Sequence, residues 1–510
     1  MGKINMAYFI EKVIYFLYIF VCTIRRDLRS VLKVVQCLII YKSFNRAVRI
    51  VLRLKLKALF ALKFNYSLDS YFKQQLKKHP TKVALISDES KWTFKQVDHF
   101  ANQVANFFTQ RGFKAADEVA LFMPSKPEHA LIWFGLSRIG VVTALINENL
   151  KSHPLVHSIT CVKPKALIFD SELEEVVNDV IEPLNEKGKI LFFSFGKSTT
   201  GKVKAENLKE LIHQQPCEEL KSNYKSNIND AVCYIYTSGT TGFPKAAIIR
   251  QHRIVFVALG VGTILSLTPD DVIYNCLPLY HTIGVVFSIS QMLVYGRTVV
   301  SSYIGEVTSY LLAQRPRVED TCHKVRKLYG AGLRPTIWKE FVERFHIKQV
   351  FEGYGSTEGN AGVGNLDNKE GSCGFLPVLM PNFIRKLFVP ITFIKVDANI
   401  GDVLRDENGF CIECKPGDTG MIIGKINNSD PIAAFEGYVN KQETEKKILR
   451  DVFKKGDAYF YSGDVLYMDE FGYFYFKDRI GDTFRWKGEN VSTNEVEGVI
   501  AKILNVADCV

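Results

Sequence analysis

The chain has 510 residues, of which 47% are hydrophobic and 23% are charged, as in ordinary globular proteins of about two to four domains. This composition excludes a wholly disordered chain, a collagen-like chain and a polytopic membrane protein. The net charge of +11 belongs to residues 1–64, which hold 13 basic and two acidic residues. Residues 65–510 are electrically balanced, so the body lacks the broad basic surface that would predict nucleic acid as a partner.

The first predicted element is an apolar run, Ala7–Ile24. Its 18 residues would form a helix of about 27 Å, close to the ~30 Å thickness of a bilayer's hydrocarbon core. Glu11 and Lys12 interrupt the run, and Arg25 and Arg26 stand where a cleavage site would need small residues. We therefore expect an uncleaved signal anchor, in preference to an amphipathic hairpin at the membrane interface or a cleaved signal peptide.

Basic residues after this run predict its orientation and its surroundings. They outnumber those before it, so the positive-inside rule places the rest of the chain in the cytosol. The stretch Arg46–Lys57 alternates basic with apolar residues and would lie along anionic headgroups. Residues 1–64 are thus predicted to be a single membrane anchor, in the endoplasmic reticulum or the plasma membrane, with membrane lipids as partners.

The body begins with alternating strand and helix patterns over residues 65–220. Apolar runs predict strands at Val83–Ile86, Val119–Met123, Val141–Ile146, Ala166–Phe169 and Ile190–Phe195. Between them, Thr93 is expected to cap a helix with apolar residues every three or four positions, and Pro127–Arg138 forms a second helix. Such alternation predicts a parallel sheet covered by helices.

After about residue 400 the pattern changes to short strands separated by Gly and Asp. The predicted strands are Gly420–Gly424, Tyr459–Tyr461, Val465–Met468 and Tyr473–Phe476. Their spacing indicates a β-rich subdomain made of hairpins.

The most informative stretch is Tyr234–Ala247, in which an apolar strand, Val232–Tyr236, runs into a loop rich in hydroxyls and glycines with one lysine. Glycines let backbone N–H groups turn toward an anion, and hydroxyls and a lysine add donors and charge. The pattern therefore predicts a triphosphate-binding loop. It is not a Walker A loop, because no GxxxxGK[ST] is present.

Residues 236–247 resemble the signature of adenylate-forming enzymes, which include acyl-CoA synthetases, luciferases and the adenylation domains of peptide synthetases. Further motifs of that family follow in the expected order at residues 277–281, 354–359, 461–464 and 478–492. The last of these resembles the branch of fatty-acid transport proteins and very-long-chain acyl-CoA synthetases. The resemblance covers roughly residues 65–500, and motif order makes it specific.

The resemblance implies a fold and a set of domains. The fold is α/β, with an adenylate-forming large domain of stacked α/β sheets plus a β-rich subdomain at residues 65–477. A hinge and the remnant of a C-terminal lid domain would occupy residues 478–510.

The resemblance also implies roles for single residues. The phosphates of ATP would be held by Thr237, Ser238, Gly239, Thr240, Thr241, Gly242 and Lys245. Glu358 would bind Mg²⁺ with Thr241 nearby, since Mg²⁺ needs only one or two carboxylates beside the phosphates. Thr241, Lys245 and Glu358 would be catalytic. Nucleotide contacts would come from Tyr354 on adenine, Asp464 and Arg479 on ribose, and Thr357, Lys487 and Gly488 beside them.

The acyl pocket is marked less clearly. In the resembled family the position of His281 borders that pocket, although a packed core histidine is the alternative. The following run, Thr282–Val294, is apolar on most sides and reads as a core helix or as the wall of an acyl tunnel.

The sequence departs from the resembled branch in two places. Little of the lid domain follows Arg479 before Val510, and the family's late lysine is absent, so we expect this chain to turn over weakly or not at all. Val299–Ser302 also runs directly into Tyr303–Glu306, where the branch has a helix-sized segment and the start of a strand. We expect part of a sheet layer to be missing there.

The predicted function is ATP-dependent activation of long-chain or very-long-chain fatty acids to acyl-CoA through an acyl-adenylate, coupled to fatty-acid uptake. ATP, Mg²⁺ and coenzyme A would be the cofactors, and a homo-oligomer is left open. The alternatives are a truncated, non-catalytic isoform that binds fatty acid or partners, and a ligase for bile acids or aryl acids.

Overall fold

The computed structural model describes residues 49–50, 52–197, 201–220, 224–239, 242–268, 270–296, 300–378, 385, 391–397, 401–427, 430, 433–479, 483–486, 489–492, 496 and 500. Contacts divide the chain into two units, Met1–Arg53 and Leu54–Val510, and the fold below is that of the second. The predicted membrane segment, Ala7–Ile24, lies outside the described residues. Within the described ranges, no helix is both long enough and apolar enough to cross a membrane.

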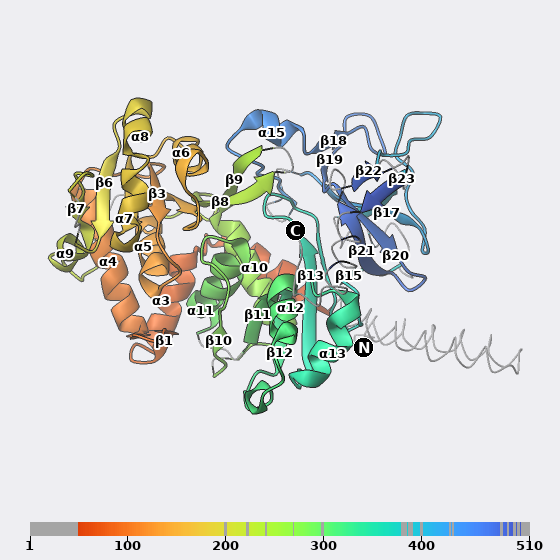
Figure 1. The fold of residues 1–510 in the computed structure, drawn as a ribbon, viewed down its shortest axis with the longest axis horizontal. Coiled ribbons are helices and arrows are strands. Elements are labelled where there is room, and N and C mark those ends of the chain that lie inside the picture. The colour runs from red at the N-terminus through yellow and green to blue at the C-terminus, as the bar shows by residue number, and fades with distance from the viewer. Residues whose placement is uncertain are drawn as a thin grey trace, which may run out of the picture. The chain divides into compact units, whose positions relative to one another are not determined.

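The first sheet has seven strands and is the parallel sheet that the sequence predicted (Figure 1). Its order is β7 (Glu206–Asn207), β6 (Leu191–Phe195), β5 (Ala166–Asp170), β3 (Glu118–Phe122), β4 (Val142–Ile146), β8 (Ala231–Gly239) and β9 (Gly242–Arg250). All neighbours are parallel except β8 and β9, which form an antiparallel hairpin. A small hairpin of β1 (Val83–Ile86) and β2 (Lys91–Thr93) precedes it.

Helices cover both faces of this sheet. Those on the first face include α4 (Phe94–Gln110) and α5 (Pro127–Ser137), and those on the second include α6 (Ser152–Thr160) and α8 (Ile181–Lys187). Successive strand residues point to opposite faces, so Val119 and Leu121 pack with the first core while Ala120 and Phe122 pack with the second. Thr93 caps α4 in a capping box with Gln96, as predicted.

The remaining helices of the body complete the layers around the sheets. They are α3 (Leu68–Lys78), α7 (Glu174–Asn178), α9 (Leu208–His213), α10 (Gln251–Ile264), α11 (Ser290–Tyr295), α12 (Gly305–Ala313), α13 (Pro335–Arg344) and α15 (Lys441–Glu445). A π-helix, η2 (Ile283–Ile289), leads into α11. Thus Thr282–Val294 is helical and mostly buried, as predicted, although its first half is wound more widely than an α-helix.

The second sheet corrects one expectation. Its strands, in order, are β10 (Ile273–Tyr274), β11 (Val300–Ile304), β12 (Lys327–Ala331), β13 (Gln349–Gly355) and β14 (Gly362–Gly364). We expected part of this layer to be missing near Val300. Instead, Ser301 pairs with both β10 and β12, and Ile304 continues the pairing with β12. Residues on both sides of the Ser302–Tyr303 junction thus form one strand. Five extended residues are enough to fill the place between the parallel neighbours β10 and β12.

The third sheet forms the β-rich subdomain that the sequence predicted. Its path is β15 (Gly374–Phe375), β21 (Tyr473–Arg479), β20 (Asp464–Met468), β17 (Thr419–Lys425), β19 (Ala458–Tyr461) and β18 (Ile448–Arg450), with β16 (Ile391–Lys395) beside β17. A separate hairpin joins β22 (Thr483–Trp486) to β23 (Glu489–Ser492).

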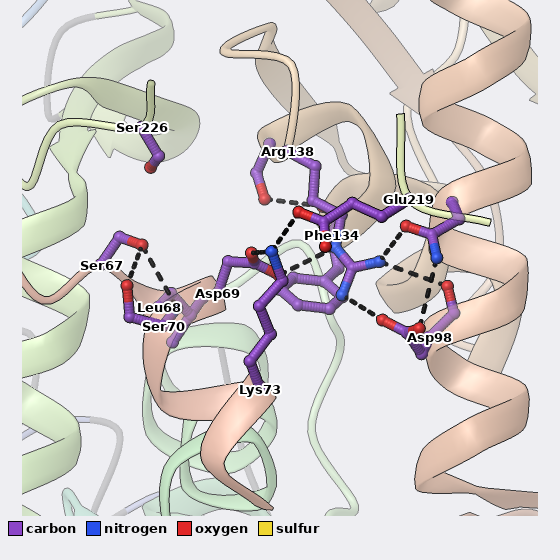
Figure 2. Close-up of polar contacts among 12 residues, drawn as sticks. Ser67, Leu68, Asp69, Ser70, Lys73, Asp98, Phe134, Arg138, Glu219 and Ser226 are labelled. Atoms are coloured by element: carbon purple, nitrogen blue, oxygen red, sulfur yellow. Dashed lines mark hydrogen bonds and ion pairs between the residues drawn. The ribbon is translucent and has the colours of Figure 1, made fainter. Parts of the chain in front are cut away.

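One buried arginine ties the first helices of the body together (Figure 2). Arg138, at the end of α5, donates through Nε to Asp69 Oδ1 of α3 at 2.9 Å and through Nη2 to Asp98 Oδ1 of α4 at 2.7 Å. A third bond reaches Asn102 Oδ1 at 2.6 Å. The guanidinium also lies 4.8 Å from the ring centre of Phe134, and only 7% of the Arg138 side chain is exposed.

Replacing this arginine tests its contribution. We expect Arg138→Met to lower the free energy of unfolding by roughly 3 kcal/mol, because it leaves the poorly exposed Asp98 without its cation and Asp69 with only Lys73. Arg111→Met is the matched control, since Arg111 also pairs with a carboxylate (Glu206) and lies over a ring, but is well exposed; its cost should stay below about 1 kcal/mol. Urea unfolding followed by tryptophan fluorescence measures both, and equal losses would refute the assignment.

Candidate functional site

The phosphate-binding motif lies in the hairpin of β8 and β9. The sequence predicted a loop after Tyr236, but the strands continue further. Thr237 pairs with Lys245, and Gly239 pairs with Gly242. Of the predicted phosphate ligands, Thr240 and Thr241 lie outside the described residues, and only the backbone of Ser238, Gly239 and Gly242 is described. The described part of the motif therefore lies on two paired strands.

Lys245 is paired with a carboxylate in this structure. Its Nζ lies 2.5 Å from Glu443 Oε2 on α15. Asn440 caps that helix by accepting from the N–H of Gln442, which fixes the end of the helix that carries Glu443. Bonds from Lys245 and Lys446 lower the pKa of Glu443, so Glu443 is a charged partner at neutral pH.

Glu358 follows β13 and is buried, with 6% of its surface exposed. Its nearest described cation is Lys447, whose Nζ lies 3.9 Å from Glu358 Oε1. The loop around it is held by Arg253 of α10, which donates to the backbone oxygens of Ser356 at 3.0 Å and Gly359 at 2.7 Å. Burial lowers the pKa of the Arg253 guanidinium, and the neighbouring Glu358 raises it. Glu358 is thus a buried carboxyl on a loop that other elements hold in place.

Tyr438 lies between Glu358 and the predicted phosphate hairpin. Its side chain is buried, and its phenol lies close enough to Glu358 to feel the charge of that carboxylate. Burial, together with the charge of Glu358, raises the pKa of this phenol, so it stays protonated and can donate to the carboxylate. The backbone of Tyr438 bridges Ala247 of β9, which fixes the side chain against both elements.

A second cluster contains three of the predicted nucleotide contacts. The Tyr354 hydroxyl donates to Asp464 Oδ2 at 2.7 Å, and Arg479 Nε donates to Asp464 Oδ1 at 2.7 Å. Asp464 and Arg479 face each other across β20 and β21. Burial and the charge of Asp464 raise the pKa of Tyr354. The carboxylate is thus oriented by one neutral and one charged donor.

The two clusters are adjacent. Lys447, which lies near Glu358, also donates to the backbone oxygen of Ser462 at 3.4 Å, and the Ser462 hydroxyl accepts from the N–H of Asp464 at 3.4 Å. Thr357 contacts Thr282, with 3.0 Å between their hydroxyl oxygens. The structure therefore brings together the predicted residues Thr237, Lys245, Tyr354, Thr357, Glu358, Asp464 and Arg479.

Other predicted residues are placed less firmly. The side chain of His281 is exposed, so the alternative of a packed core histidine is wrong. Nearby protein atoms still desolvate the ring enough to lower its pKa. His281 directly precedes Thr282, so it lies beside the loop of Glu358. Lys487 and Gly488 lie outside the described residues.

Sequence reasoning missed Arg253, Tyr438 and Lys447. Arg253 could have been found from the sequence. A cation in the first turn of a helix is unfavourable for the helix dipole, so its presence there suggests a specific partner. Tyr438 and Lys447 carry no such signal. Their partners lie on other elements, far away in the sequence.

The site was also tested for its fit to a divalent metal. No group of three or more His, Cys, Asp or Glu side chains that could hold a metal occurs among the described residues. A single buried carboxylate is nevertheless sufficient for Mg²⁺ that arrives with nucleotide phosphates, because such sites use one or two carboxylates plus phosphate and water. Glu358 fits that requirement.

Comparison with known sequences shows which proteins the chain resembles. The family described as AMP-binding enzyme matches residues 72–309. The chain is 41% identical to long-chain fatty acid transport protein 1 of Rattus norvegicus over 462 residues, which are 86% of this chain and 70% of that protein. It is 40% identical to the Homo sapiens protein of the same name, over 90% of this chain and 74% of that protein. Long-chain fatty acid transport protein 2 of Rattus norvegicus is 36% identical, over 85% and 72% of the respective chains.

Comparison with solved structures places the fold. An anthranilate CoA ligase in complex with anthranoyl-AMP has a TM-score of 0.71 at 19% identity, over 87% of this chain and 84% of that one. A long-chain-fatty-acid–CoA ligase from Archaeoglobus fulgidus has a TM-score of 0.65 at 19% identity, over 87% and 88% of the chains. The fold is therefore that of the adenylate-forming enzymes, with an α/β body and a β-rich subdomain.

The pair of Lys245 and Glu443 leads to a prediction about nucleotide affinity. We expect Glu443→Gln to strengthen Mg-ATP binding about threefold, since it removes a modest ion pair that competes with phosphate for the lysine. Glu445→Gln on the same helix is the control, because Glu445 pairs with Arg450 instead. Isothermal titration calorimetry measures both, and weaker binding by Glu443→Gln would mean that Glu443 orients the lysine for phosphate.

The Asp464 cluster leads to a second prediction. Tyr354→Phe keeps the aromatic face but removes one donor to Asp464, so we expect AMP to bind about fivefold more weakly, the value of one hydrogen bond. Tyr473→Phe is matched to it, because Tyr473 donates to Asp367 at 2.9 Å, at the opposite end of β21 from Arg479. The control should bind AMP normally. Equal binding by Tyr354→Phe and the parent would contradict the role of the cluster.

Proposed function

Because the chain belongs to the AMP-binding enzyme family and to its long-chain fatty acid transport protein branch, we propose that it activates fatty acids with ATP. The acid carboxylate would attack the α-phosphate of ATP, form an acyl-adenylate and release pyrophosphate. Coenzyme A would then displace AMP to give the acyl-CoA. Trapping the acid as a thioester would drive its uptake.

The observation that carries this proposal is the path from the hairpin to Glu358 through residues 438–447. Tyr438 pairs with Ala247 of β9, Glu443 pairs with Lys245, and Lys447 Nζ lies 3.9 Å from Glu358 Oε1. Transfer to phosphorus needs little covalent work from a protein, and depends on positioning and on charge stabilisation. This path holds a phosphate-binding hairpin at a fixed distance from a buried carboxylate. Magnesium held by Glu358, with Thr241 nearby, would supply positive charge next to the phosphates.

The other predicted residues would each bind a different part of the substrates. The hairpin residues Thr237 to Gly242 would hold phosphate, and Lys245 would add a charge once it leaves Glu443. Tyr354 would stack on adenine while Asp464 and Arg479 hold the ribose. Thr357, Lys487 and Gly488 would lie along the nucleotide, and His281 would border the acyl group.

The acid is proposed to be a long-chain or very-long-chain fatty acid. Two observations support an apolar substrate near the site: the name of the fatty acid transport relatives, and the apolar helical run from η2 into α11 beside His281. Bile acids and aryl acids are the competing substrates, and a panel of acids distinguishes them.

The proposed domain plan and location follow the sequence. Residues 1–64 would anchor the protein in the endoplasmic reticulum or plasma membrane, residues 65–477 would form the adenylation domain on the cytosolic side, and residues 478–510 would form the hinge and lid segment. Coenzyme A would enter between the last two parts.

The test is ATP–pyrophosphate exchange by membranes that carry the chain, with Mg-ATP and a panel of very-long-chain, long-chain, bile and aryl acids. Label accumulates during exchange, so a slow first step is sufficient. We expect exchange above vector membranes that depends on long-chain acid. An exchange rate equal to that of vector membranes would defeat the proposal, and a response to bile or aryl acids alone would change the substrate.

The same exchange assay tests the proposed role of Glu358 in holding the metal. We expect Glu358→Gln to lower exchange by about a hundredfold or more, the usual loss when one preorganised charge at a reacting centre is removed. Glu370→Gln is the control, because Glu370 is exposed and lies on a turn beyond β14. Comparable exchange by both variants would show that Glu358 holds no reacting metal.

A further inference from the structure

An apolar stripe lies exposed on the helix formed by residues 54–63, which precedes α3. Leu56, Leu59 and Phe60 are 68%, 59% and 52% exposed, and Phe64 in the turn that follows is 54% exposed. Spacings of three and four residues put these side chains on one face of the helix. The opposite face buries Ala58 and Ala61 in the body. The helix therefore presents large apolar side chains outward and small ones inward, the reverse of an ordinary surface helix.

Bonds to the body hold this face outward. Lys57 Nζ donates to Thr263 Oγ1 of α10 at 3.0 Å and to the Tyr295 hydroxyl of α11 at 3.2 Å. At the end of the helix, Asn65 donates to the backbone oxygen of Ser226 and accepts from the N–H of Ile228, both at 2.8 Å. These bonds join the helix to three separate segments, so it cannot roll its apolar face inward without breaking them.

The positive charge of residues 49–64 favours a negatively charged partner. Residues 49–64 contain five basic residues and no acidic one. At about 100° per residue, Lys55 and Lys57 lie on either side of Leu56, and Lys63 lies on the same face as Phe60. Lysines at the borders of an apolar stripe suit an anionic lipid surface, where their stems cover apolar area and their ammonium groups reach the headgroups. Lys57 uses its ammonium to hold the helix to the body, so the headgroup contacts fall to the other lysines of the stripe. A second copy of the chain would bring cations against cations.

We propose that this helix docks on the surface of a bilayer containing anionic lipid, with Leu56, Leu59, Phe60 and Phe64 at the boundary between headgroups and acyl chains. This inference rests on the proposed membrane location and adds to it a second contact, made by the enzyme body itself. Amphipathic helices of this kind lie in the plane of the interface. The contact would therefore set the orientation of the body against the membrane.

The experiment is hydrogen–deuterium exchange of the full chain, read by mass spectrometry, with and without phosphatidylcholine vesicles that contain phosphatidylserine. We expect amides of residues 54–66 to exchange about tenfold more slowly on these vesicles, because docking suppresses local opening of the helix. Vesicles of phosphatidylcholine alone should slow them less. Unchanged exchange on the anionic vesicles, or equal slowing on both kinds, would overturn the proposal.

Paired variants separate docking from a change of fold. Leu56→Glu with Phe60→Glu should abolish the slowing, whereas Tyr310→Glu with Leu311→Glu, at exposed apolar positions of α12, should leave it intact. Both pairs replace exposed side chains, so their thermal unfolding midpoints should match that of the parent. Slowing that survives Leu56→Glu with Phe60→Glu would overturn the proposal. Slowing that grows with protein concentration without lipid would also overturn it, in favour of a second copy.

The result is independent of the proposed enzyme activity. If the chain sediments with vesicles and catalyses exchange but residues 54–66 stay unprotected, the docking face is wrong and the proposed function stands. If the residues are protected but no acid supports exchange, the docking face stands and the function is wrong.

Discussion

The buried carboxylate of Glu358 is the constraint around which the site is arranged. A charge in a protein interior is costly unless hydrogen bonds and cations compensate it. Here groups from separate elements surround it. The Lys447 ammonium lies at 3.9 Å, the phenol of Tyr438 lies close enough for the charge of Glu358 to raise its pKa, and Arg253 holds the backbone on both sides of the carboxylate. Compensating one charge therefore fixes α10, the loop after β13 and the segment before α15 in one geometry.

The described site is also close to electrically neutral before any ligand arrives. Lys245 pairs with Glu443, and Arg479 pairs with Asp464, just as Lys447 lies against Glu358. In the proposed function, a triphosphate with its metal would exchange these partners: metal for lysine at the buried carboxylate, and phosphate for carboxylate at Lys245. Such exchanges favour a ligand that brings both signs of charge, as Mg-ATP does, over a bare anion or a bare cation.

Much of the fold could be predicted because it depends on local patterns. Apolar runs predicted most of the strands of the first sheet and four strands of the third. The Thr93 cap was predicted because it directly precedes a helical pattern. The end of the hairpin of β8 and β9 was predicted to be a loop, because Gly and Thr are common in turns. Whether such residues form a strand depends instead on the strand that pairs with them. The strand at Val300–Ile304 was missed for the same reason. Tyr438 was missed because both its partners are distant in sequence.

Helix α10 connects the candidate site around Glu358 to the helix that carries the exposed apolar stripe. Its first turn carries Arg253, which holds the loop of Glu358, and its last turn carries Thr263, which accepts from Lys57 of the outward-facing helix. Ten residues of α-helix separate them, a rigid span of about 15 Å. A body oriented through the proposed docking of the apolar stripe would therefore also be oriented at the carboxylate. If the proposed substrate is an apolar acid that partitions into the bilayer, holding the site at a fixed height above the membrane would set the distance that the acid travels out of the lipid.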